Sequence, residues 1–256
     1  MTIILYLAFG LLPSFIWLLF YLRKDSHPES NGMILKVFFL GMVAAAVAAF
    51  IEVAISRIFL SNDTSKELAS FFPFPSFLIY HFILISLIEE LAKFSVVKLK
   101  VMKSSEMDEP VDIMLYMIIS ALGFAALENL IYILPLLFPG EQMTIYQAGV
   151  ISFFRFAGST LLHALCSATI GFFLAYSILT HRFKLFYLSF GIAIAVLLHG
   201  LFNISIIGIE GGLTDKNSFL LVSSIGFLIA LLVLLSIAVS LGFKKLKKTA
   251  SVCRIK

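Results

Sequence analysis

The residues of this sequence that could do chemistry are ionisable and amide side chains placed inside long apolar stretches. In chain order they are Glu89, Glu90, Lys93, Glu128, Asn129, His163, His199 and Asn203. A carboxylate and a neutral imidazole that face a trapped water are the parts of a general-base hydrolase. Asn side chains, or a second His, can donate hydrogen bonds to a developing oxyanion. These residue types therefore predict hydrolysis, and Lys93 lies one helical turn after Glu89, where the two charges can neutralise one another.

The same side chains would also suit a metal ion. His163, His199 and Glu89 form a His₂Glu set, which leaves a coordination position open for water in zinc hydrolases. No His-Glu-x-x-His motif occurs, and the two imidazoles come from different apolar stretches. Spacing alone therefore leaves a metal-free and a zinc mechanism open.

Other reaction classes fit the sequence less well. Cys166 follows His163 by three residues and could form a dyad with it, but a buried apolar Cys is usually inert packing. Ser159 has no Gly-x-Ser-x-Gly around it, and no Asp lies deep in an apolar stretch. The alternative from a different class is a proton-coupled transporter that uses buried Glu and His, although no internal repeat is visible.

The elements that must position these residues are membrane-spanning helices. Of the 256 residues, 61% are hydrophobic and only 13% are charged, whereas soluble domains have about 45–50% and about 25%. Apolar stretches of about 20 residues predict seven spans, at 3–22, 33–56, 74–97, 112–137, 149–179, 185–208 and 218–242. We expect an all-α polytopic membrane bundle that forms one domain over 1–256. Its catalytic core would lie at 74–208, with peripheral helices at 3–22, 33–56 and 218–242.

The basic residues predict the orientation of this bundle. Of the 19 Lys and Arg residues, 14 lie after the first, third and fifth predicted spans or in the C-terminal tail. The positive-inside rule places that side in the cytoplasm, so the N-terminus should be outside and the C-terminus inside. The formal net charge of +4 thus belongs to the membrane surface, and we expect no nucleic-acid partner.

Four of the candidate residues should lie at similar depth in the bilayer. Counting from the outer end of each predicted span places Glu89 and His163 about 15 and about 14 residues deep. By the same count, Glu128 and His199 each lie about 9 residues deep. At about 1.5 Å per residue, all four fall in a slab of about 9 Å in the middle to outer half of the bilayer. We therefore expect them to meet in one intramembrane cavity.

Three further ionisable residues lie in predicted spans. Glu52 and His81 stand alone, and we expect each to hydrogen-bond a neighbouring helix. Arg155 could extend its guanidinium outward to the membrane surface or act as a counter-ion for the buried carboxylates. The sequence leaves both possibilities for Arg155 open.

The order of the motifs resembles the PrsW family of bacterial intramembrane proteases. The matching runs are Glu-Glu-x-x-Lys at Glu89, Gly-Phe-Ala-x-x-Glu-Asn at Gly123, His163 with Ser-Ala-x-x-Gly downstream, and His-x-x-x-Asn at His199. The resemblance covers about 85–205, the third to sixth predicted spans. This family is related more distantly to the CAAX-processing and bacteriocin-protection glutamyl membrane proteases.

The resemblance implies an endopeptidase of the bacterial cell membrane that cuts a single-span substrate, such as an anti-sigma factor, near the extracytoplasmic side. It implies that Glu89 is the base, that Glu90 supports it and that His163 is its imidazole partner. His199 and Asn203 would be oxyanion or substrate donors, and Glu128 with Asn129 would take a second-carboxylate place. We expect a metal-free glutamate mechanism without a cofactor. The alternative is Zn²⁺ held by His163, His199 and Glu89.

Overall fold

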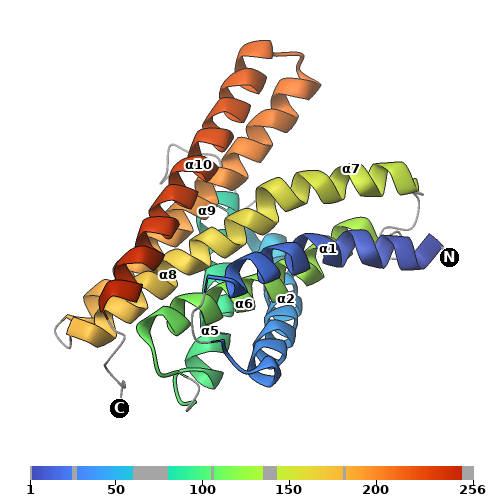
Figure 1. Cartoon of the computed structure of the whole chain (residues 1–256). Coiled ribbons are helices and arrows are strands. Elements are labelled where there is room, and N and C mark those ends of the chain that lie inside the picture. Colours follow the sequence, from blue (N-terminus) through green and yellow to red (C-terminus); the bar gives the residue numbers. More distant parts are fainter. Residues whose placement is uncertain are drawn as a thin grey trace.

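The computed structural model describes residues 2–24, 28–59, 80–104, 107–134, 143–180 and 183–249, and it is helical without strands over these ranges. The elements, in chain order, are α1 (Thr2–Leu22), α2 (Asn31–Phe59), the π-helical segment η1 (Tyr80–Ile85), α5 (Ser86–Lys100), α6 (Pro110–Ile133), α7 (Ile145–Arg155), a second π-helical segment η2 (Phe156–Thr160), α8 (Leu161–Thr180), α9 (Lys184–Thr214) and α10 (Ser218–Thr249). Figure 1 shows their arrangement as one bundle.

Six segments of the described chain are long and apolar enough to cross a membrane: Ile3–Leu22, Asn31–Arg57, Pro110–Ile133, Ile145–Thr180, Lys184–Thr214 and Ser218–Lys248. They correspond to six of the seven predicted spans and confirm a polytopic helical membrane protein. The remaining predicted span, 74–97, begins outside the described residues and continues as η1 and α5. This segment carries the two glutamates and the lysine of the predicted site.

Helix α6 is the centre of the bundle and packs against α1, α2 and α8. Its first turn is capped by Asp112, whose Oδ2 accepts hydrogen bonds from the backbone N–H groups of Asp108 (3.2 Å) and Glu109 (2.6 Å). Pro110 occupies the first turn, where its missing N–H costs nothing. The helix is apolar nearly all round, as expected for a helix covered on every side.

Glycines allow α2 and α6 to approach closely. A Cβ added to Gly123 would collide with the carbonyl group of Phe38, and one added to Gly41 would collide with the carbonyl group of Ser120. Small residues at crossings let backbones come into direct contact, which is how helices associate in lipid. These two positions therefore set the distance between α2 and the central helix.

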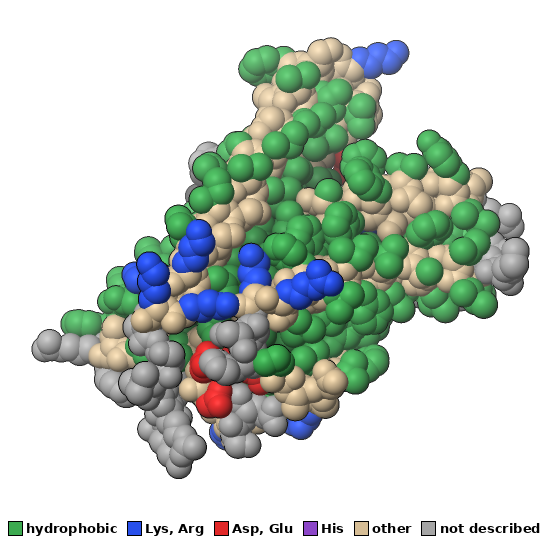
Figure 2. Space-filling model, in the orientation of Figure 1, with side chains coloured by type: hydrophobic (Ala, Val, Ile, Leu, Met, Phe, Trp, Pro, Cys, Tyr) green, Lys and Arg blue, Asp and Glu red, His purple; other side chains and the backbone are tan. Residues whose placement is uncertain are grey.

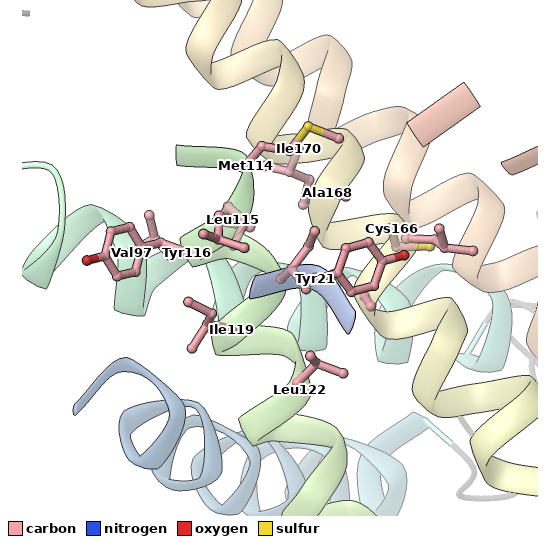
Figure 3. Packing of buried hydrophobic residues seen from close by; sticks show 14 of the residues in the cluster. Tyr21, Val97, Met114, Leu115, Tyr116, Ile119, Leu122, Cys166, Ala168 and Ile170 are labelled. Atoms are coloured by element: carbon pink, nitrogen blue, oxygen red, sulfur yellow. The ribbon is translucent and has the colours of Figure 1, made fainter. Parts of the chain in front are cut away.

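The apolar core surrounds α6. Figure 3 shows Leu115, Ile119 and Leu122 of α6 packed among side chains from other helices, including Cys166. Cys166 is a free, fully buried cysteine within this cluster, which agrees with the interpretation of this residue as packing. The core places α5, α6 and α8 rigidly against one another.

Two pairs of helices extend away from this centre. In Figure 1 the α9–α10 hairpin and the α1–α7 pair diverge from the bundle in different directions. Figure 2 shows an outer face that is largely apolar, with most of its visible Lys and Arg side chains gathered towards one end. The apolar face suits contact with lipid, and the predicted orientation of the termini remains a prediction.

Candidate active site

The predicted residues are brought together by α5, α6, α8 and α9. Helix α5 follows η1 directly, and α8 follows η2 directly, so a π-helical segment precedes both the glutamate pair and His163. Such segments occur frequently at functional sites, because the wider turn changes the direction of the side chains that follow. On α9, Gly200 lies against the backbone of Phe82 in η1, where no Cβ would fit. This close approach brings the adjacent His199 towards α5.

Lys93 is the hub of the site, and its side chain is 0% exposed. Its Nζ donates to Glu90 Oε1 at 2.8 Å and to Glu89 Oε2 at 3.3 Å. It also lies 2.8 Å from His163 Nδ1 and 4.5 Å from the centre of the Phe124 ring. An ammonium group can only donate hydrogen bonds, so His163 Nδ1 must accept, and the proton of a neutral His163 is on Nε2.

The other nitrogen of His163 is held by Glu128. His163 Nε2 lies 2.8 Å from Glu128 Oε2 and donates to it. The same carboxylate oxygen forms an ion pair with Arg155 Nη2 at 3.1 Å. The structure thus shows Arg155 as a counter-ion of the Glu128 carboxylate inside the bundle, which is one of the two possibilities that the sequence left open. Both nitrogens of His163 are engaged.

Glu90 fixes the other histidine. Its Oε1 lies 2.9 Å from His199 Nδ1, and its Oε2 accepts from Ser167 Oγ at 3.2 Å. Because a carboxylate only accepts, His199 carries its proton on Nδ1 and presents the lone pair of Nε2 to the site. The Glu90 side chain is 0% exposed and has a partner on both oxygens, so it serves to position Lys93 and His199.

Glu89 is the less constrained carboxylate of the pair. Its Oε2 lies 3.6 Å from His163 Nδ1 and 3.8 Å from His199 Nε2, distances beyond a direct hydrogen bond. Its side chain is 9% exposed, whereas that of Glu90 is fully buried. Within the described residues, Glu89 accepts a hydrogen bond from Lys93 alone. Among the described residues no hydrogen bond uses the lone pair of His199 Nε2, which lies 3.8 Å from this carboxylate.

Three of these residues form a possible metal site. Glu89, His163 and His199 offer one ligand atom each, and these atoms lie within 4.8 Å of one another in a buried setting. Two imidazoles and a carboxylate are a donor set that zinc hydrolases use, so the residues fit Zn²⁺. In the structure the ammonium group of Lys93 donates to two of the three, Glu89 and His163. A bound zinc ion and Lys93 would therefore compete for the same lone pairs.

The amide side chains lie at the edge of the cluster. Asn129 donates to Thr160 Oγ1 at 3.1 Å and accepts from Arg155 Nε. Asn203 donates to Ser86 Oγ at 3.4 Å. Thr160 and Ser86 were not among the candidate residues. Ser86 had a detectable signal, since it precedes Glu90 by four residues on one face of α5.

Glu52 and His81 are the two ionisable residues that stood alone in their predicted spans. We expected Glu52 to hydrogen-bond a neighbouring helix; its carboxylate oxygen Oε1 is buried without a hydrogen-bond partner among the described residues. The backbone carbonyl of Glu52 accepts from Tyr80 Oη of η1 at 2.9 Å. The side chain of His81 lies outside what the structure describes.

Comparisons with known proteins find relatives over most of the chain. A sequence model of the family described as "PrsW family intramembrane metalloprotease" matches residues 29–242. The chain is 27% identical over 197 residues to "Protease PrsW" of Oceanobacillus iheyensis, covering 77% of this chain and 80% of that protein. It is 26% identical over 184 residues to "Protease PrsW" of Geobacillus kaustophilus, covering 72% and 71%. No solved structure matches.

Proposed function

Because the chain belongs to the PrsW family and is an intramembrane protease, we propose that Glu89 is the base that activates the hydrolytic water. The observation that carries this proposal is the difference within the glutamate pair. Both oxygens of Glu90 have partners in the buried network, whereas the Glu89 side chain is 9% exposed and its Oε2 lies 3.8 Å from the lone pair of His199 Nε2. Lys93 balances the charge of Glu89 at 3.3 Å.

The geometry supports a simple sequence of proton transfers. A water molecule that donates to Glu89 Oε2 and His199 Nε2 would have its oxygen lone pair free to attack the peptide carbonyl carbon. Glu89 accepts one proton of that water as the carbon–oxygen bond forms. It then delivers the proton to the amide nitrogen as the carbon–nitrogen bond breaks, which leaves one new carboxyl group and one new amine.

The roles of the two histidines in this scheme differ from those that the family resemblance implies. His199 acts as an acceptor for the water, because its only proton is directed at Glu90. The amide of Asn203, one turn along α9, is the proposed donor to the oxyanion. His163 positions Lys93 through the bond of 2.8 Å to its Nδ1.

A zinc mechanism is the second candidate, and the ligand set of Glu89, His163 and His199 is the observation that favours it. Bound zinc would polarise the carbonyl group and acidify a coordinated water. In that case Glu90 would orient His199 through its Nδ1–H, as outer-shell carboxylates do for metal-bound histidines. We favour the metal-free form because Lys93 already supplies a positive charge at these ligands.

The proposed base is tested by Glu89→Gln, which keeps the shape of the side chain and removes its basicity. We expect cleavage of a co-expressed single-span membrane substrate to fall by about 10²–10⁴-fold, with an unchanged amount of protein in the membrane. Glu210→Gln, on the exposed end of α9, is the matched control and should cleave normally. Wild-type cleavage by Glu89→Gln would overturn the assignment.

The metal question needs its own measurement. Elemental analysis of the purified protein should find no stoichiometric zinc, and treatment with a chelator should leave cleavage unchanged. One zinc per chain that is lost in His199→Ala would instead establish the zinc mechanism.

We further propose that the substrate is a single-span membrane protein of the anti-sigma-factor type, cut near the extracytoplasmic side. The family resemblance and the predicted depth of the site, in the middle to outer half of the bilayer, support this. In a strain without the protease, such a substrate should accumulate uncut. In a variant with both native cysteines replaced by serine, a membrane-impermeant maleimide should label Lys216→Cys from outside the cell but not Lys247→Cys. The reverse labelling would overturn the predicted orientation.

A further inference from the structure

We propose that Arg155 is a positioning residue of the protease, acting on the proposed base through Glu128, His163 and Lys93. The inference rests on the proposed role of Glu89. It concerns a residue outside the four matched motif runs, at the point where α7 passes into η2 and α8. In Figure 1 this point lies where α7 joins the rest of the bundle.

Arg155 contacts one short stretch of α6 with its whole guanidinium group. Its Nη2 lies 3.1 Å from Glu128 Oε2, in an ion pair that lacks hydrogen-bond alignment. Its Nε donates to Asn129 Oδ1, and its guanidinium carbon lies 4.2 Å from the centre of the Tyr132 ring. The side chain of Arg155 is 13% exposed, and that of Glu128 is 24% exposed. The pair therefore forms the more accessible edge of the cluster.

The backbone next to Arg155 is held in place by α1. Trp17 Nε1 donates to the carbonyl oxygen of Phe156 at 2.9 Å, and the two rings stack at 5.1 Å. In α7, Ser152 Oγ donates to the carbonyl oxygen of Phe9 at 2.7 Å. Contacts with α1 therefore hold the chain both before Arg155, at Ser152, and after it, at Phe156. This allows the guanidinium group of Arg155 to hold Glu128 in one position.

A continuous chain of contacts connects Arg155 to the base. Arg155 pairs with Glu128, which accepts from His163 Nε2 at 2.8 Å. His163 Nδ1 then accepts from Lys93 at 2.8 Å, and Lys93 donates to Glu89 at 3.3 Å. The contact between His163 and Lys93 depends on Glu128, because His163 can accept from Lys93 only while its own proton points at Glu128.

Loss of Arg155 would release the carboxylate of Glu128. A carboxylate that has lost its cation in a largely apolar setting is drawn towards water, because an isolated charge is costly there, and the Glu128 side chain is already 24% exposed. Glu128 would then no longer accept from His163 Nε2, and nothing would keep the histidine proton on that nitrogen. A proton on Nδ1 would face the ammonium group of Lys93, with two donors opposed. Lys93 would then lose the contact that, together with Glu90, positions it beside Glu89.

This inference is tested by comparing Arg155→Gln with the charge-balanced double variant Glu128→Gln/Arg155→Gln. A glutamine at 128 can still accept from His163 Nε2 through its amide oxygen, and it carries no charge that needs Arg155. We expect kcat to fall about tenfold or more in Arg155→Gln, with KM changed less than about threefold. The double variant should recover most of the lost kcat, and Arg155→Lys, which keeps the positive charge, should recover part of it. Non-additivity of this kind is the signature of interacting residues.

A merely structural role for Arg155, joining α7 to α6, predicts a different result. The contact between these helices would be lost in both variants, so the double variant would be no better than Arg155→Gln. That outcome would overturn the inference, as would normal kcat in Arg155→Gln itself. Arg57→Gln, an exposed arginine of α2, is the matched control and should behave as wild type. Glu89→Gln, assayed alongside, distinguishes this inference from the proposed function. Normal cleavage by Glu89→Gln would overturn Glu89 as the base. An inactive Glu89→Gln together with no recovery in the double variant would overturn only the role of Arg155.

Discussion

Helices α6 and α10 look alike in sequence but have opposite places in the structure. Both are apolar enough to cross a membrane, and α10 is the more apolar of the two. Yet 94% of the most apolar stretch of α6 is buried inside the protein, against 17% for α10. In a bilayer, lipid solvates an apolar side chain as well as another helix does, so apolarity does not drive a helix to the centre.

The features that separate the two helices are small and polar residues. Helix α6 carries Gly123 at its crossing with α2, and it carries Glu128 and Asn129 in the site. Helix α10 has no ionisable side chain before Lys244, near its end. Close packing and polar contacts therefore decide which helices form the centre. Paired substitutions in the inner helices and in α10 test this.

Of the paired substitutions in an inner helix and in α10, the lysine pair should differ most in activity and stability. Lys93→Met removes the cation that balances the buried glutamates, and loss of one partner of a buried ion pair costs about 3–5 kcal/mol. We expect the variant to lose cleavage and to unfold at a clearly lower temperature in detergent micelles. Lys247→Met, exposed on α10, should change neither property. A stable, active Lys93→Met would show that another cation balances the glutamates.

The leucine pair, one in α6 and one in α10, should show a smaller difference in stability. Leu122→Ala in α6 would leave a cavity in a packed core, at a cost of about 2–5 kcal/mol. Leu234→Ala in α10 exchanges a side chain that is 67% exposed, and lipid can fill the space that it leaves. Thermal unfolding in detergent micelles, followed by circular dichroism, measures both. Equal losses in the two variants would contradict the peripheral position of this face of α10.

The glycine pair, again one in α6 and one in α10, should show the smallest difference in stability. Gly123→Ala places a methyl group against the backbone of α2, and overpacking of this kind costs about 1–3 kcal/mol. Gly226→Ala in α10 meets nothing within 4 Å, and it should leave stability unchanged or raise it by up to about 1 kcal/mol. The same unfolding measurement applies. If Gly123→Ala unfolds as the wild type does, α2 and α6 can separate at no cost.

Much of the fold could be predicted because the spans depend on composition over about 20 residues. Six of the predicted spans correspond to apolar helices of the structure, with ends displaced by a few residues. The convergence of Glu89, Glu128, His163 and His199 was also predictable, because residues at equal depth on neighbouring helices can meet. The sequence predicted a span at 74–97, but it did not predict that this segment begins as the π-helical η1 before it continues as α5.

The sequence by itself determined the class of protein, most of the residues that cluster in the candidate site and the order of the motifs, because each of these depends on residue type and on distance along the chain. Only the tertiary structure decided that Glu89 is the more accessible glutamate, that Lys93 lies between Glu89 and His163, and that Arg155 pairs with Glu128. Glu89 and Glu90 are neighbours in sequence but point in different directions around the axis of α5. The residues that each one contacts therefore depend on the helices packed against that side of α5. The proton position of each histidine follows from whether its neighbour can donate or only accept, a property of contacts between residues up to 109 positions apart.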